Sequence, residues 1–240
     1  MNRSLVGFLA FLLVLVVAGL VGTWILGPNL VGLAIDEERR SAPYYLLNFA
    51  AGESALERSI YRSDLAELVV SDGGQLLWQA PTVRVVEGRV RDEWQHVQLF
   101  EFPRAGDFVE MFTSSSYRAI ADAHPGVSLM LLGTSNAPAA LAGGGAFVLS
   151  LMSLEADQAA IGATDRRLLG DLESYGGTMI WASEVEDLED QWTWNRVLML
   201  GFPTLELAEA WLRDPDTVTD RALAATVARR RVTLVLESQT

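Results

Sequence analysis

The chain has 240 residues with 18 basic and 31 acidic side chains, which give a formal net charge of −13. All 18 basic residues are arginines. It contains no cysteine and only two histidines. This composition excludes disulfides, thiolate metal sites, a thiol nucleophile and any chemistry that needs a lysine, such as a Schiff base or the phosphate-binding lysine of a P-loop. The acidic balance also argues against a nucleic-acid partner, because few positive charges could face the phosphates.

A long apolar segment opens the chain. No ionisable side chain occurs from Ser4 to Ile35, and the stretch from Leu5 to Leu26 would form a helix of about 33 Å, close to the ~30 Å hydrocarbon core of a bilayer. We therefore expect a single-pass anchor over residues 1–35 in the cell membrane. The expected orientation places the amino terminus in the cytoplasm and the soluble part in the periplasm or the extracellular space. A cleaved signal peptide is the alternative, although its apolar core normally spans only about 7 to 15 residues.

Two patterns of similar length follow the anchor and share the same order of motifs. The run Tyr44–Phe49 has the composition of a strand and is aligned with Phe147–Met152, and each run precedes a stretch of helical character. Each half then has a pair of glycines whose second member lies four residues before a tryptophan, Trp78 in the first half and Trp181 in the second. The paired glycines suit the carboxyl end of a helix that leads into a strand.

The halves match again at their third strand. Residues 94–103 align with residues 194–203, since both segments begin with Trp and end with Phe-Pro, where proline stops the strand. A helical segment and a last strand complete each half. The pattern predicts two ferredoxin-like β-α-β-β-α-β units, the first half at residues 42–133 and the second half at residues 146–238. A small-residue linker at residues 134–145 separates them.

This order of elements resembles the dimeric α/β barrel superfamily. Within it, the chain resembles a small bacterial family of unknown function in which Trp follows Phe-Pro by eight residues, as Trp211 follows Pro203 here. The resemblance covers nearly all of residues 42–238, although the first half has Met111 at the position that matches Trp211. The resemblance implies that two sheets pair to form a barrel and that one chain supplies both as an intramolecular pseudodimer. The expected fold class is α+β, with a transmembrane helix followed by two tandem ferredoxin-like units that form a pseudodimeric α/β barrel. The superfamily includes oxygenases, haem-handling proteins and binding modules, so the fold alone does not identify the chemistry.

Candidate ligand-binding residues lie on the third strand of each half. Alternation along this strand places Trp94, His96 and Gln98 on one face, and the matching positions of the second half carry Trp194 and Arg196. Polar groups beside aromatic rings are typical of a ligand pocket at the mouth of a barrel. The alternative is that His96 and Arg196 lie in the solvated part of the sheet, because single polar residues on strands are mostly exposed.

Two more candidates follow from the resemblance to superfamily oxygenases, in which an Asn and a His line the cavity. These are Asn48 on the first strand and His124 at the end of the second helix. His124 also fits a structural role, because a histidine at a helix end interacts with free carbonyl groups. A metal site on both histidines would need carboxylates as well, and His124 has no Glu-x-x-His spacing, so no metal site is expected. No cofactor is predicted, and haem is the one that the resemblance leaves open.

Three functions remain open, and no residue is assigned a catalytic role. The preferred one is a membrane-tethered, non-catalytic module that binds a small molecule or a protein partner, because it needs no residue type that the chain lacks. A monooxygenase-like or haem-handling enzyme is the first alternative, and it requires a pocket that holds the candidate groups within hydrogen-bond reach. The second alternative is a structural or assembly protein at the membrane, whose packed sheets would leave no cavity.

Overall fold

The computed structural model describes residues 43–50, 54–88, 94–124, 128–133, 138–139, 145–154, 166, 169, 172–188, 194–219 and 228–237. The predicted anchor at residues 1–35 lies outside the described residues, as does most of the predicted linker. Within the described ranges, no helix is both long enough and apolar enough to cross a membrane.

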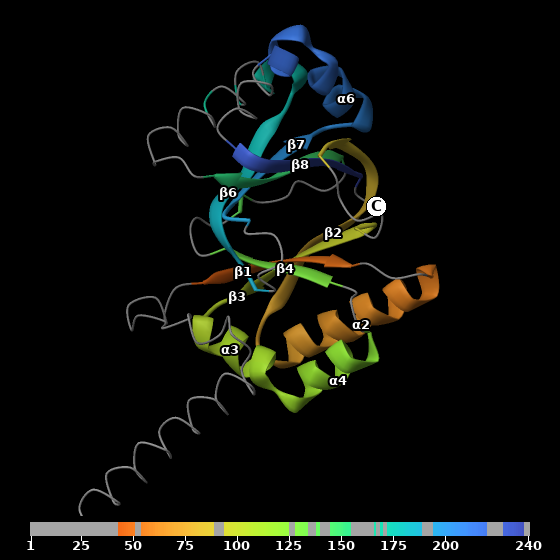
Figure 1. The fold of residues 1–240 in the computed structure, drawn as a ribbon, viewed down its shortest axis with the longest axis vertical. Helices are drawn as coiled ribbons and strands as arrows, with labels where there is room; N and C mark the ends of the chain where they lie inside the picture. The colour runs from red at the N-terminus through yellow and green to blue at the C-terminus, as the bar shows by residue number, and fades with distance from the viewer. Residues whose placement is uncertain are drawn as a thin grey trace, which may run out of the picture.

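The strands of both halves close into one antiparallel barrel (Figure 1). The first half provides β1 (Tyr44–Ala50), β2 (Gln75–Glu87), β3 (His96–Phe102) and β4 (Ser128–Gly133). The second half provides β5 (Ala146–Leu154), β6 (Thr178–Asp187), β7 (Arg196–Phe202) and β8 (Ala228–Glu237). Their order around the barrel is β1-β3-β2-β8-β5-β7-β6-β4. Each half therefore forms one sheet, and the sheets are joined where β2 pairs with β8 and β4 pairs with β6.

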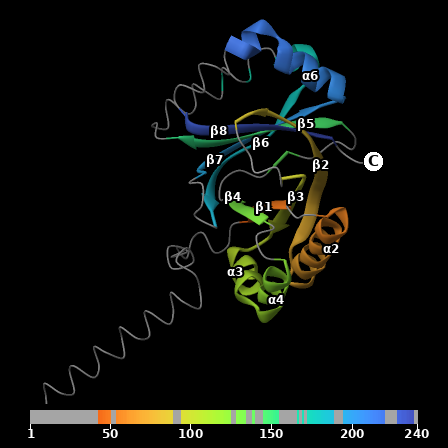
Figure 2. The same cartoon turned by 45° about the vertical axis from the view of Figure 1, so that its right-hand side comes forward.

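Helices cover the outer faces of the barrel at opposite ends of the molecule (Figures 1 and 2). The first sheet carries α2 (Ala55–Ser71), α3 (Ala105–Thr113) and α4 (Ser115–Ala123), and the second carries the short 3₁₀ helix η2 (Leu172–Tyr175) and α6 (Leu205–Arg213). A capping box of Ser54 and Glu57 begins α2. The single helix expected after β3 is two helices, because the Ser114 hydroxyl accepts a hydrogen bond from the Tyr117 amide and caps a new helix there.

Apolar side chains fill the barrel itself. The interior cluster includes four buried tryptophans, Trp78, Trp94, Trp181 and Trp194. Separate clusters lie between each sheet and its helices, and Trp211 of α6 belongs to the one on the second sheet. Among the described residues, the barrel interior is thus an apolar core that is separate from the two clusters under the helices.

The two sheets share local irregularities as well as strand order. The register shifts immediately before Trp78 in β2 and immediately before Trp181 in β6, which is a β-bulge at the same place in both sheets. Before each of these strands, the first glycine of the pair has a positive φ, 88° at Gly73 and 67° at Gly176. Only glycine adopts this conformation without strain, which explains the paired-glycine motif at the end of the preceding helical turn.

The sequence alignment of the first strands is wrong by one residue. Tyr44 lies opposite the phenylalanine of the first Phe-Pro motif, whereas Ala146, and not Phe147, lies opposite that of the second. Because side chains alternate between the two faces of a strand, this slip exchanges the faces. The residue that corresponds to Asn48 is therefore Ser150, which is also buried but has a much smaller polar group.

Candidate functional site

His96 and Gln98 face α2 and not the barrel interior. The intervening residue Val97 belongs to the interior cluster, so alternation directs its two neighbours to the outer face. The polar face of β3 is thus covered by α2 and does not lie at the mouth of the barrel. Trp94 departs from the predicted face, because it precedes the strand and packs inside the barrel with its ring centroid 4.9 Å from that of Phe49.

A buried hydrogen-bond network joins the first sheet to α2. Asn48 and Gln98 have no exposed surface and Tyr61 is 2% exposed. The Asn48 side-chain amide donates to Gln98 Oε1 at 3.1 Å, and the Tyr61 hydroxyl donates to Asn48 Oδ1 at 3.0 Å. Gln98 Nε2 in turn donates to the backbone carbonyl of Arg62 at 3.3 Å. The two amides therefore bond to each other and to α2, and they fix the helix over β3.

Arg62 and His96 meet at the edge of this network. His96 is only 7% exposed, so the expectation that it lies in a solvated part of the sheet is wrong. Nη1 of Arg62 lies 2.8 Å from Nδ1 of His96 and also faces Nε2. Burial, followed by the positive charges of Arg62 and Arg58, lowers the pKa of His96 to about 4. The imidazole is neutral at neutral pH and has one unprotonated nitrogen, which lies next to a guanidinium group.

A cavity of about 400 Å³ lies beside this pair at the amino-terminal end of α2. We call it the arginine cavity, and its lining includes Arg58, Arg62, Thr82, Gln95 and His96. The Thr82 hydroxyl oxygen is buried and has no hydrogen-bond partner among the described residues.

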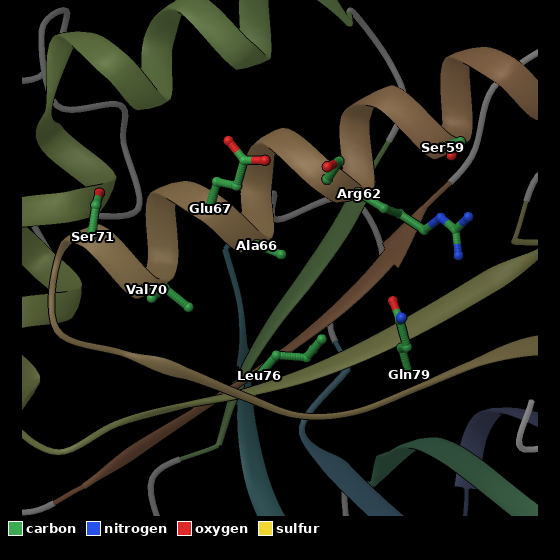
Figure 3. Close-up of a pocket in the computed structure, with 9 residues that line it drawn as sticks. Ser59, Arg62, Ala66, Glu67, Val70, Ser71, Leu76 and Gln79 are labelled. Atoms are coloured by element: carbon green, nitrogen blue, oxygen red, sulfur yellow. The ribbon is translucent and has the colours of Figure 1, made fainter. Parts of the chain in front are cut away.

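A second cavity of about 630 Å³ continues along α2 and is called the α2–β2 groove here. Figure 3 shows Ala66 and Val70 on the helix side and Leu76 and Gln79 on the strand side. Arg62 lines this groove as well as the arginine cavity. The two spaces are therefore adjacent, and one is lined mainly by polar groups and the other in large part by apolar ones.

The other sequence candidates lie elsewhere. His124 ends α4, where its backbone amide donates to the carbonyls of Ile120 and Ala121, and its ring meets the Tyr61 ring edge-on at 5.6 Å. It lines neither of the two cavities described above. Trp194 belongs to the barrel interior, and Arg196 occupies on the second sheet the position that His96 has on the first. Of the candidates, the structure brings together Asn48, His96 and Gln98.

Sequence reasoning missed the contribution of α2. Arg58 and Arg62 are one helical turn apart, and Tyr61 lies on the buried side of the same helix. The spacing of the two arginines was visible in the sequence as a signal that both project to similar sides of a helix. What they face was not visible, because His96 is 34 residues away in the chain.

The second sheet lacks this arrangement. On the first sheet, three amide side chains lie side by side across the strands, at Asn48, Gln98 and Gln79. The corresponding positions of the second sheet are Ser150, Leu198 and Ala182. The polar site under α2 is therefore a property of the first half alone within the described part of the chain.

The surroundings of His96 do not fit the haem that the resemblance left open. A haem iron bound to His96 would have to displace the Arg62 guanidinium and lie beside two positive charges that already disfavour a proton on this ring. The described residues also include no group of three or more His, Asp or Glu side chains that could hold a metal ion.

Comparisons with known proteins identify relatives of the second half and of the fold. Residues 146–237 match a family described as a domain of unknown function (DUF1330). A search of curated proteins finds no match.

Three solved structures share the overall fold. An anthrone oxidase-like protein has a TM-score of 0.56 and 8% identity, over 84% of this chain and 93% of that one. A protein of Fusobacterium nucleatum subsp. nucleatum, provisionally named a monooxygenase, has a TM-score of 0.52 and 8% identity, over 83% of this chain and 94% of that one. A mutant chlorite dismutase from Candidatus Nitrospira defluvii has a TM-score of 0.52 and 13% identity, over 85% of this chain and 96% of that one.

Identities this low establish the fold and not the activity. The chain has an α+β fold whose antiparallel barrel resembles those of dimeric α/β barrel proteins, and its second half matches the DUF1330 domain.

Proposed function

We propose that the first half carries a monooxygenase-like site in the arginine cavity, where His96 removes a proton from a bound small molecule. The observation that carries the proposal is a neutral, buried imidazole whose Nδ1 lies 2.8 Å from a guanidinium nitrogen at the wall of a cavity. Removal of a proton from an acidic C–H or O–H group leaves an anion. Arg62 and Arg58 are placed to stabilise that anion.

The low pKa of His96 is compatible with this role. A pKa of about 4 makes the ring a weak base while the cavity holds no anion, because two positive charges oppose protonation. A negative charge that develops in the cavity would offset those charges and favour the protonated ring. It would also draw the Arg62 guanidinium away from the imidazole and leave a ring nitrogen to accept the proton. Binding and proton transfer are then coupled.

Dioxygen is the second reactant in this proposal. A methylene carbon activated by a neighbouring carbonyl group loses a proton to His96, and the carbanion adds dioxygen to give a hydroperoxide after reprotonation. Loss of water from the hydroperoxide, with removal of the second hydrogen, leaves a carbonyl group. In sum, one CH₂ group and one O₂ give one C=O group and one H₂O, so the electrons come from the substrate itself.

The fold neighbours support an enzyme over the non-catalytic module that the sequence favoured. Two of them carry names that describe oxidase-like or monooxygenase proteins. A purely structural protein is disfavoured for another reason, since it would need no cavity beside the candidate residues, whereas His96 and Arg62 line one.

The test uses the full-length chain in phosphatidylcholine nanodiscs with dithranol, an anthrone, as the probe. Exchange of its methylene protons for deuterium reports proton removal, and oxygen uptake reports oxidation. We expect both to exceed the rates with empty nanodiscs, and His96→Gln to lower the accelerated rate by a factor of about 10² to 10⁴. His124→Gln is the matched control and should leave it unchanged. Equal rates for the wild type and His96→Gln, or no acceleration of either process, would refute the proposal.

We also propose that residues 1–35 tether this site to the cell membrane, with the folded part outside the cytoplasm. The support is the uncharged segment from Ser4 to Ile35. The chain should stay in the membrane pellet after alkaline carbonate extraction, and externally added protease should digest the folded part in intact spheroplasts. Release by carbonate would disprove the anchor, and protection from protease would reverse the orientation.

A further inference from the structure

We propose that the molecule bound at this site is an amphiphilic monoanion, with its acidic group in the arginine cavity and its apolar part in the α2–β2 groove. The inference rests on the location of the site given under the proposed function, and it specifies the class of ligand, to which the anion formed by proton removal also belongs. It comes from two properties of the cavities, namely their charge and their division into a polar and an apolar space.

The charge of the arginine cavity is opposite to that of the whole protein. The chain carries a net charge of −13, yet the described residues that line the cavity include two arginines and no acidic side chain. The two guanidinium groups belong to adjacent turns of α2, and Nε of Arg62 donates to the Arg58 carbonyl at 3.2 Å. None of the ion pairs among the described residues involves Arg62. A half-buried cation without a carboxylate partner is a favourable position for an anionic ligand.

The electrostatic environment of Arg62 agrees with this assignment. Burial, followed by repulsion from Arg58, lowers the pKa of Arg62. An anion placed between the two side chains would relieve that repulsion.

The adjoining groove suits the apolar part of the same molecule. Ala66, Val70 and Leu76 contribute apolar surface to it, and Val70 is 59% exposed in spite of its apolar side chain. Arg62 lines both spaces, so a ligand that passes along its side chain would have its acidic end in one and its body in the other. Volumes of about 400 and 630 Å³ lie within the usual range for small-molecule sites.

The groove also limits the charge of the ligand. Its surface is in large part apolar, and the basic side chain among its described lining residues is Arg62. A second acidic group at the far end of the ligand would have to leave water for this surface without a basic partner. Glu67 is exposed, and Figure 3 shows its carboxylate directed away from Leu76 and Gln79. The groove therefore selects an apolar body without a distal charge.

The experiment compares three ligands that share one ring system. Biphenyl monocarboxylate, its methyl ester and biphenyl dicarboxylate are titrated by calorimetry into the full-length chain in phosphatidylcholine nanodiscs, with empty nanodiscs as the blank. We expect the monocarboxylate to bind at least tenfold more tightly than either of the others. Inorganic phosphate is a further ligand that tests whether the anionic group alone suffices, and we expect it to bind at least tenfold more weakly than the monocarboxylate.

Variants assign the selectivity to the residues named. Arg62→Gln should weaken binding of the monocarboxylate at least tenfold and leave the ester unchanged, and Arg58→Gln should act in the same direction. Arg118→Gln on α4 makes the same change of charge at an exposed position and should have no effect.

Equal affinity for acid and ester, no binding of any ligand, or unchanged selectivity in Arg62→Gln would overturn the inference. Phosphate binding as tight as that of the monocarboxylate would also overturn it, because the groove would then have no role. The measurement does not depend on turnover. If the monocarboxylate binds selectively but dithranol is not deprotonated, the proposed reaction is wrong and the proposed ligand class stands. If dithranol is oxidised but the acid binds no more tightly than the ester, the proposed reaction stands and the ligand class is wrong.

Discussion

The buried imidazole of His96 makes protein stability depend on pH in a defined direction. Its pKa is about 4 in the folded chain, against 6.5 for an unperturbed histidine. Between these two pH values the unfolded chain binds more protons than the folded one, so the free energy of unfolding falls as the pH falls. His96 therefore contributes stability that is fully present above pH 6.5 and is lost as the pH falls towards 4. At about 1.4 kcal/mol per pH unit, the contribution is roughly 3 kcal/mol.

The perturbation that isolates this contribution is His96→Gln, because glutamine is polar but does not titrate. Urea unfolding is followed by tryptophan fluorescence at pH 7 and pH 4 for the wild type and the variant, in the same nonionic detergent. The carboxylates of the chain titrate in this range too, but they are common to both proteins and cancel in the comparison. We expect the wild type to lose roughly 3 kcal/mol more than the variant on acidification.

Equal losses of stability in the two proteins would refute the electrostatic account of His96. A second measurement separates the causes of the low pKa. An NMR titration of the imidazole in Arg62→Gln should give a pKa above that of the wild type but still below 6.5, because burial remains as the largest cause. A pKa that does not change would show that Arg62 is not close to the ring in solution.

Three further substitutions and one control, Gly106→Ala, test the framework around the site by urea unfolding, with hydrogen exchange added for the last. Gly74→Ala should destabilise the fold by about 1 to 3 kcal/mol, because the added Cβ would lie 2.7 Å from a methyl group of Val69 on α2. Gly106→Ala should be neutral or slightly stabilising, because no atom lies within 4 Å of its added Cβ. Equal effects of the two substitutions would contradict this packing. Tyr61→Phe should cost about 1 to 3 kcal/mol, because Asn48 Oδ1 loses its buried donor, and no loss would argue against the bond. Ser54→Ala should cost about 1 kcal/mol and speed amide exchange in the first turn of α2, and unchanged exchange would count against the capping box.

Local patterns in the sequence predicted much of the secondary structure. Period-two alternation and the Phe-Pro ending located the third strand of each half, and the structure has β3 and β7 there. The paired glycines predicted a turn into the following strand, and Gly73 and Gly176 have the positive φ that such a turn requires. These signals can be read from sequence because each depends on the conformation of a few adjacent residues.

The faces of the strands could not be determined in the same way. The sequence alignment of the first strands located both strands but was shifted by one residue. It matched Asn48 with Leu151, on the opposite face of β5, and not with Ser150. Composition did not expose the error, because both faces of β1 are buried, one by the barrel interior and one by α2. Only the pairing of β1 with β3 decides which side chains meet the helix.

The sequence by itself determined the order of the strands, the special glycines and the absence of thiol and lysine chemistry, because these depend on composition and on short-range backbone preferences. The tertiary structure decided that β2 pairs with β8 and β4 with β6 to close the barrel. It also decided that Arg62 of α2 meets His96 of β3 beside a cavity. Contacts between residues distant in the chain depend on how complete elements pack. For this reason the candidate site, unlike the elements that build it, became visible only in the folded chain.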